Sequence, residues 1–185
     1  MNVRGRKGIS KAQWLDAALE ELAFRSVSAI SIEKIARKLG IAKSGFYWHF
    51  KDRDDLLSEL LAFWTHEMTE VVTDNRELAK LEPKKRLYRT AEMILDNDLI
   101  RYEIGIRQWA LNDDTAAKAV EAVNNARLKY SKQAFLDYGF SDYEAEVRGM
   151  IYCVYASWET PMFRELARKK KLAMAHDRIE ILFQK

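Results

Sequence analysis

The sequence predicts an all-α protein with about nine helices, on the basis of three observations. Only 2 prolines and 7 glycines interrupt 185 residues, so few positions break a helix. Apolar residues recur every three to four positions along most of the chain, which is the spacing of one helix face. Alternating apolar and polar runs, which would indicate half-buried strands, are hard to find.

Composition is typical of a soluble globular protein, with 48% hydrophobic and 32% charged residues. The single cysteine, Cys153, excludes a disulfide within the chain, which fits a reducing cytoplasm. The first ten residues are basic but lack the apolar segment of a signal peptide, and no stretch reaches the length of a membrane span. We therefore expect a cytoplasmic protein with no membrane partner.

Basic residues are concentrated in residues 1–53. This segment holds 11 Lys/Arg and 5 Asp/Glu, a balance of 11 − 5 = +6, whereas residues 54–185 hold 31 − 11 = 20 and 28 − 5 = 23, a balance of −3. Such an asymmetry indicates that the first segment alone binds a polyanion, although it also arises by chance. We expect two domains, a head (1–53) and a body (54–185).

The head pattern predicts three helices. Ser10 precedes an amphipathic helix over residues 11–24, and Ser31 caps a short helix. That helix ends at Gly40, which supplies the left-handed conformation of a tight helix exit. A further short helix is expected from about residue 42 to residue 50. Two short helices joined by such a turn form a helix-turn-helix, whose second helix can enter the DNA major groove, although plain helical hairpins are also common.

Amphipathic spacing predicts six helices after the head. They cover residues 55–72, 83–97, 99–111, 115–138, 142–158 and 176–183. Ser141 and Glu144 form a capping box, S-x-x-E, at the start of the fifth. We expect a break or kink at Thr160–Pro161 and a solvated basic run at residues 168–171.

Residues 41–57 combine aromatic rings with basic residues, which suits neither a core helix nor a solvated loop. In a short helix, Lys43, Ser44, Tyr47 and Trp48 lie near one exposed face. Ring O–H and N–H donors, together with lysines, suit phosphate oxygens. Lys43 and Ser44, at the front of the helix, are better placed for base edges.

The remaining rings of this stretch are expected to face inward. Phe46 and Phe50 lie four positions apart and can hold the short helix against its domain. We also expect Trp48 to be partly buried with them.

Residues 31–57 contain a wider pattern, made of Ile35-Ala36, Gly40-Ile41, the aromatic block 46–50, Arg53 and Asp55-Leu56-Leu57. This pattern resembles the DNA-binding segment of TetR-family (tetracycline-repressor-like) regulators. The resemblance implies that Tyr47, His49 and Arg53 touch phosphates. Gly45 stands where the family often has Thr, and Arg53 replaces the usual Lys, which should still serve as a phosphate donor.

The candidate DNA-binding residues therefore lie between the supporting helix and the start of the fourth helix. They are Ser31, Lys43, Ser44, Gly45, Tyr47, Trp48, His49, Lys51 and Arg53. Glu33, in the supporting helix, is acidic and close to the expected DNA, which opposes contacts by that helix.

The resemblance also implies that the body binds a ligand and dimerises. Independently, the helix at 142–158 is apolar nearly all round, so it must be buried on two sides. One side can be its own body and the other a second subunit; the alternative is a central helix of a monomeric bundle. The expected dimer-interface residues are Val147, Met150, Ile151, Val154, Trp158, Ile179 and Leu182.

Large side chains in the body, some with polar tips, are candidates for lining a small-molecule site, although such side chains also fill ordinary cores. They are Trp64, Met68, Met93, Tyr102, Trp109, Tyr130 and Tyr155. The three histidines are far apart in sequence and lack metal-ligand spacing, and there is no glycine-rich phosphate loop. We therefore expect no catalytic residue, no metal and no cofactor.

The sequence is best interpreted as that of a ligand-responsive transcriptional repressor. It would act as a homodimer that binds a near-palindromic double-stranded DNA operator and leaves it when a small-molecule effector enters the body. Three alternatives stay open: an activator, a sequence-independent DNA binder, and an all-α enzyme.

Overall fold

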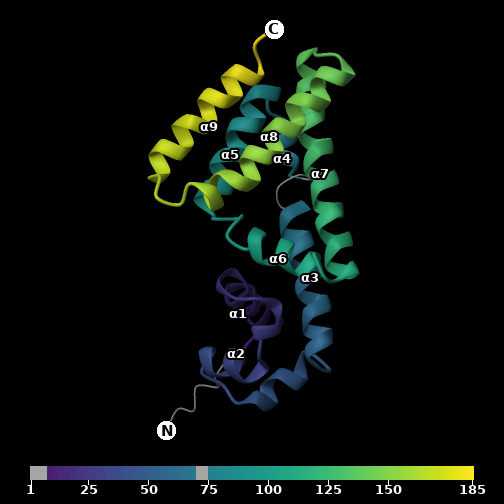
Figure 1. Ribbon diagram of the computed structural model, residues 1–185, viewed down its shortest axis with the longest axis vertical. Helices are drawn as coiled ribbons and strands as arrows, with labels where there is room; N and C mark the ends of the chain where they lie inside the picture. The colour runs from purple at the N-terminus through teal and green to yellow at the C-terminus, as the bar shows by residue number, and fades with distance from the viewer. Residues whose placement is uncertain (1–7, 70–74) are drawn as a thin grey trace.

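The computed structural model describes residues 8–69 and 75–185, and over these ranges the chain is all-α, as predicted (Figure 1). The helices are α1 (Lys11–Phe24), η1 (Val27–Ala29), α2 (Ile32–Lys38), η2 (Lys43–Trp48), α3 (Arg53–Thr69), α4 (Arg76–Ala79), α5 (Pro83–Asp96), α6 (Glu103–Ala110), α7 (Asp114–Tyr138), α8 (Asp142–Met162) and α9 (Arg168–Leu182), where η marks a 3₁₀ helix. No helix in these ranges is both long and apolar enough to cross a membrane.

The head and the far end of the body lie at opposite ends of the molecule. Figure 1 places α1 and α2 near the N-terminus, and α9 and the C-terminus at the other end. The helix α3 leads from the head into the body, where it contacts α7, and α6 packs against both α1 and α7. The helices α3 and α6 are therefore the structural links between the two regions.

Helix ends follow the capping residues in the sequence. Ser10 forms a capping box with Gln13, and Ser141 forms the predicted one with Glu144. Gly139 ends α7 in the left-handed conformation, with φ of 98°.

The expected break at Thr160–Pro161 is absent. The helix α8 continues through Pro161 to Met162; the proline lacks one N–H donor, and the helix ends one residue later. The basic run 168–171 forms the first turn of α9, in which Arg168, Lys169 and Lys170 are exposed, as predicted, whereas Lys171 is only 7% exposed.

Two further differences occur before α7. The predicted helix at 99–111 begins only at Glu103, because Asp98, with φ of 47°, takes a non-helical backbone conformation. The short helix α4 was not predicted; Asn75 caps it by accepting hydrogen bonds from two backbone N–H groups. Residues 70–72 of the predicted helix 55–72 lie outside the described residues.

The buried apolar residues form two clusters, and the first crosses the predicted domain boundary. It joins the head to α3, α6 and the start of α7, and includes Trp14, Leu22, Ile35, Phe46, Leu60, Trp64, Ile106 and Val123. The second lies between α5, α7, α8 and α9, and includes Leu87, Phe135, Tyr152, Ile179 and Phe183. The division at residue 53 stays a prediction; the core of the head continues into the body.

The body approaches the head closely at Gly105 of α6. A Cβ atom at this position would lie 2.4 Å from the backbone oxygen of Leu22 in α1, closer than real atoms come. Only glycine therefore allows α6 to pack directly against α1. Because no gap separates the two helices here, a movement of α6 is passed on to α1.

Candidate functional site

The turn between α2 and η2 is held by backbone geometry. Ser31 caps α2 by accepting a hydrogen bond from the Lys34 N–H. Gly40, with φ of 69°, allows the Ile41 N–H to donate to the carbonyl of Ala36 at 3.0 Å. This Schellman-type exit fixes the direction in which η2 leaves the turn.

The predicted helix at 42–50 is a 3₁₀ helix over Lys43–Trp48. Phe46 and Phe50 are buried, as predicted, and their rings stack 5.0 Å apart. Trp14 of α1 meets the Phe46 ring edge-on at 5.4 Å. The expectation for Trp48 is wrong: its side chain is 87% exposed, because the inward face of η2 is already filled by the two phenylalanines.

Five side chains project from η2 and the residues after it. Lys43, Ser44, Tyr47, Trp48 and Lys51 are exposed, and the two rings are 56% and 87% exposed. Exposed rings beside lysines on a buried scaffold form a surface suited to contact with another molecule. We call these five residues the head surface.

One side chain of the head surface, that of Lys43, is already paired with the acidic residue Glu33. The Lys43 ammonium donates to a Glu33 carboxylate oxygen at 2.5 Å, and Ser31 donates to the other oxygen at 2.9 Å. The hydrogen bond from Lys43 is the main reason why the pKa of Glu33 falls to about 2. The same bond raises the pKa of Lys43. Both groups are therefore charged at neutral pH.

Besides Ser31 and Lys43, two further predicted DNA-binding side chains make hydrogen bonds within the head. The His49 Nε2 atom lies 2.8 Å from the carbonyl oxygen of Ile9. The Arg53 guanidinium donates to the carbonyls of Ile30 and Val27 at 3.1 and 2.7 Å. Both groups thus connect the segment around η2 to the rest of the head.

Gly45, the remaining candidate, is partly buried on η2. A Cβ atom there would lie 3.4 Å from the Ile41 side chain, an ordinary contact. The backbone at Gly45 therefore leaves room for a small side chain.

The body contains two adjoining cavities. One, between α5, α8 and α9, encloses about 460 Å³ of space between atoms, and the other, between α3, α5, α7 and α8, about 480 Å³; both volumes include parts open to solvent. Ile94, Ile100, Tyr152 and Ala156 line both. Their lining is mainly apolar with a few polar side chains, which is the usual lining of small-molecule sites. We call the first the outer cavity and the second the inner cavity.

The predicted ligand-binding residues are distributed over several places. Met68 and Tyr130 line the inner cavity, and Tyr155 lines the outer one. Trp64, Tyr102 and Trp109 belong to the core shared by head and body, whereas Met93 is partly buried on α5. Large aromatic residues were not a sufficient signal, because most of the cavity lining is aliphatic.

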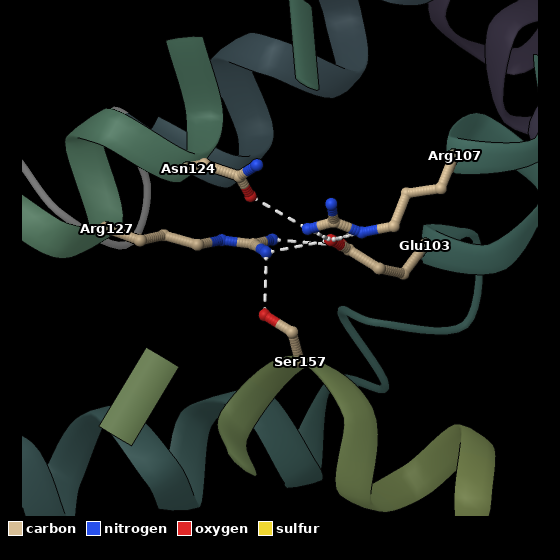
Figure 2. Close-up of polar contacts among 5 residues, drawn as sticks. All are labelled: Glu103, Arg107, Asn124, Arg127 and Ser157. Carbon is tan, nitrogen blue, oxygen red and sulfur yellow. Dashed lines mark hydrogen bonds and ion pairs between the residues drawn. The ribbon is translucent and has the colours of Figure 1, made fainter. Parts of the chain in front are cut away.

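A polar cluster that the sequence did not suggest lies beside the inner cavity (Figure 2). Glu103, the first residue of α6, is completely buried and accepts hydrogen bonds from Arg107 and Arg127. Arg127 also donates to Ser157 of α8 at 3.0 Å. The cluster joins α6, α7 and α8, and the only local signal for it was the i, i+4 spacing of Glu103 and Arg107.

One face of α8 is exposed and apolar. Val147, Met150, Ile151, Val154 and Trp158 are between 36% and 57% exposed, whereas Tyr152, on the opposite side, is buried. On α9, Ile179 and Leu182 are packed inside the chain's own core, so they do not belong to an exposed face; the exposed apolar residues of that helix are Met174 and Ile181. We call Val147, Met150, Ile151, Val154 and Trp158 the α8 face.

Comparison with known proteins gives a family for the head. Residues 15–60 match the model of "Bacterial regulatory proteins, tetR family". The HTH-type transcriptional regulator AcrR of Shigella flexneri is 44% identical over 46 residues, which are 25% of this chain and 21% of that protein. The matched stretches cover only 21% to 40% of the curated relatives' lengths.

Solved structures extend the likeness to nearly the whole fold. A TetR transcriptional regulator from Legionella pneumophila has a TM-score of 0.75 at 14% identity, over 97% of this chain and 98% of that one. AibR, solved in complex with isovaleryl coenzyme A and operator DNA, has a TM-score of 0.67 at 17% identity, over 94% and 97%. At such identities the likeness concerns the fold alone. The head thus matches the tetR family of bacterial regulatory proteins, and the likeness over the rest of the chain shows a shared fold.

Proposed function

We propose that the chain is a DNA-binding transcriptional regulator that responds to a small molecule, most simply a repressor. The head surface carries this proposal, because it places two lysines, two aromatic side chains and a serine on a rigid turn in a head of net positive charge. Such donors suit the phosphates and base edges of DNA.

Within the head surface, we assign different roles to different residues. Lys43 and Ser44, at the start of η2, face base edges, and Tyr47, Trp48 and Lys51 hold phosphates. The head surface is positioned by Ser31, Gly45, His49 and Arg53. The side chains of Ser31, His49 and Arg53 make hydrogen bonds within the head. Glu33 then serves as the internal partner of Lys43 until DNA replaces it.

We propose that the protein works as a homodimer through the α8 face. A row of exposed apolar side chains on one helix is costly in water unless it is covered. A second copy would bring a second head, which two half-sites of an operator require.

We further propose that a ligand in the body moves the head through α6. This helix begins at Glu103, beside the inner cavity, and presses on α1 at Gly105, two residues later. A ligand that changes the position of Glu103 therefore changes the support of the head and favours dimers that no longer match the operator. AibR, with the same fold, was solved with isovaleryl coenzyme A and operator DNA, which is consistent with such a scheme.

The proposal is tested by selecting duplexes from a random DNA library with the purified chain. We expect enrichment of a sequence with two similar half-sites, bound on the order of 10³-fold more tightly than a scrambled duplex. Equal binding of both duplexes would identify a sequence-independent DNA binder, and no binding would contradict the proposal. A reporter gene behind the selected sequence separates a repressor from an activator.

A further inference from the structure

The charges around Glu103 do not balance. One carboxylate, completely buried, is shared by two guanidinium groups, those of Arg107 and Arg127, and the other contacts of the cluster, Asn124 and Ser157, are neutral. Figure 2 shows the two arginine side chains converging on Glu103 from α6 and α7. The cluster therefore carries one positive charge in excess around a completely buried carboxylate.

The two arginines bind Glu103 in different ways. The Arg127 Nη1 and Nη2 atoms donate one to each carboxylate oxygen, at 3.0 and 3.1 Å, whereas the Arg107 Nε and Nη2 atoms both donate to Oε1, at 2.9 and 2.6 Å. One carboxylate therefore serves two guanidinium groups, and a second anion could bind to one of them.

A second ion pair near the cavities has no such excess. Arg178 meets Glu159 with two parallel hydrogen bonds of 2.7 and 2.5 Å, one to each carboxylate oxygen. Both residues line the outer cavity, and each charge is matched by one opposite charge. An anion entering the outer cavity would therefore gain little from Arg178.

Arg127 is also placed where a ligand can reach it. It lines the inner cavity, in which it is the sole charged residue among the described lining residues, the others being apolar or neutral polar side chains such as Tyr130, Tyr152 and Cys153. Burial raises the pKa of these two tyrosines and of the thiol, so they stay uncharged at neutral pH and would not repel an anion. Arg107, Arg127 and Ser157 also line a groove of about 650 Å³ that is open to solvent in the single chain. The wall of this groove includes Met150, Val154 and Trp158 of the α8 face.

We propose that Arg127, assisted by Ser157, binds the carboxylate of a small apolar acid whose body occupies the inner cavity. Glu103 is the internal anion that the ligand carboxylate displaces from Arg127. This inference rests on the proposed function, since it names the chemical class of the effector and the first contact that the effector changes. Release of Arg127 from Glu103 would then act on α6, which Glu103 begins.

Direct binding to the purified chain, without DNA, tests the carboxylate site. The probes are the straight-chain carboxylates from butanoate to dodecanoate, with benzoate and phenylacetate, each paired with its neutral primary amide and measured by calorimetry. We expect at least one acid to bind the wild-type chain about 10-fold or more tightly than its amide. Failure of every acid to bind, or equal binding of an acid and its amide, overturns the proposal without any variant.

Variants then locate the site. Arg127→Gln should remove the preference for the acid, whereas the matched control Arg178→Gln, which changes the paired arginine of the outer cavity, should keep it. Glu103→Gln should tighten binding of the acid several-fold, because the competing carboxylate is gone. If Arg178→Gln abolishes the preference and Arg127→Gln does not, the site is assigned to the wrong end of the cavities.

The dependence on the proposed function is separated by a second readout. The acid that binds best is added to the chain on its selected DNA duplex, and release is measured for wild type and Arg127→Gln. A chain that binds the acid but never DNA would refute the regulator and leave the carboxylate site standing. A chain that binds DNA but no acid would refute the carboxylate site alone. Should Glu103→Gln not fold, Arg107→Gln serves instead, and we expect it to weaken acid binding less than Arg127→Gln does.

Discussion

The head and the body of this protein differ in how far apart in sequence their proposed binding residues lie. Residues 15–60 match a family model, and stretches of 46 to 54 residues are 35% to 44% identical to three curated relatives, whereas nearly the whole fold is shared with solved structures at 13% to 18% identity. The head surface comes from one turn and one short helix that are adjacent in sequence. The cavities of the body come from α3, α5, α7, α8 and α9, which are far apart in sequence.

This contrast follows from what each region is proposed to bind. The phosphate backbone of DNA is the same in every operator, so a head that grips it can keep the same residues in the same local arrangement. A small-molecule effector differs from one regulator to the next, so the body can keep its helices and change the residues that line the cavities. A first prediction tests what both regions require, a second copy of the chain.

Val154→Glu should have the largest effect on DNA binding. Val154 is 57% exposed in the single chain, so the substitution should leave the fold intact but place an unpaired charge in the proposed dimer interface. We expect a monomer in sedimentation experiments and a loss of affinity for the selected two-site duplex of about 100-fold or more, because the two heads no longer act together.

The matched control for the α8 face is Leu111→Glu, which changes an even more exposed apolar residue at the end of α6. It should leave the oligomeric state and the DNA affinity unchanged. If wild-type protein sediments as a monomer at micromolar concentration, the interface and the two-site mechanism are both refuted.

Gly105→Ala should break the contact that joins the two regions. The added Cβ would lie 2.4 Å from the Leu22 backbone oxygen, so α6 and α1 must move apart. We expect a loss of about 1–3 kcal/mol in the free energy of unfolding, measured by urea denaturation, together with weaker DNA binding. The control Gly8→Ala, at a position where an added Cβ would have no atom within 4 Å, should change neither the stability nor the DNA affinity. If Gly105→Ala is as stable as the wild-type chain, α6 and α1 are not closely packed at this position.

Much of the head could be predicted from the sequence because its determinants are local. Ser31, Gly40 and the inward-facing Phe46 and Phe50 act within a few residues of one another, and all four were read correctly. The exposure of Trp48 was missed because it depends on how η2 packs against the head, where Phe46 and Phe50 already fill the inward face of η2.

The body could be predicted as helices but not as a site. Periodicity identified α5, α7 and α8, whereas Ile94, Arg127 and Ser157 come together only after those helices pack. The exposed face of α8 was predictable because one helix carries all of it. Hydrophobic periodicity says which face of a helix is covered, but not by which partner.

Within the head, Lys51→Ala and Arg53→Ala should separate binding from positioning. Lys51 is exposed, and its loss should reduce the dependence of log K on log salt by about 0.9 with little change in stability. Arg53 donates to two carbonyls, and its loss should instead lower the free energy of unfolding by about 1–3 kcal/mol. Salt titrations of DNA binding and urea denaturation of both variants distinguish the two roles. If Arg53→Ala changes the salt dependence but not the stability, Arg53 is a phosphate contact.

The smallest effect is expected from Glu33→Gln, which should strengthen DNA binding roughly two- to fivefold. The substitution removes the carboxylate that holds Lys43 and a negative charge close to the proposed DNA. Affinities for the selected duplex, measured at constant salt, provide the check. Glu77→Gln, which removes an exposed carboxylate paired with Lys80 on the body, is the matched control and should have no effect.

The pKa of Glu33 makes this prediction sharper. A carboxyl whose pKa is lowered to about 2 keeps its ion pair above its ordinary pKa of 4.5 and loses it only as the pH falls through about 2. Glu33 is therefore fully charged at both pH 5.5 and pH 8. The ratio of the DNA affinity of Glu33→Gln to that of the wild-type chain should be the same at these two pH values. A ratio that approaches one at pH 5.5 would mean that Glu33 is already protonated there and that Lys43 is free before DNA arrives.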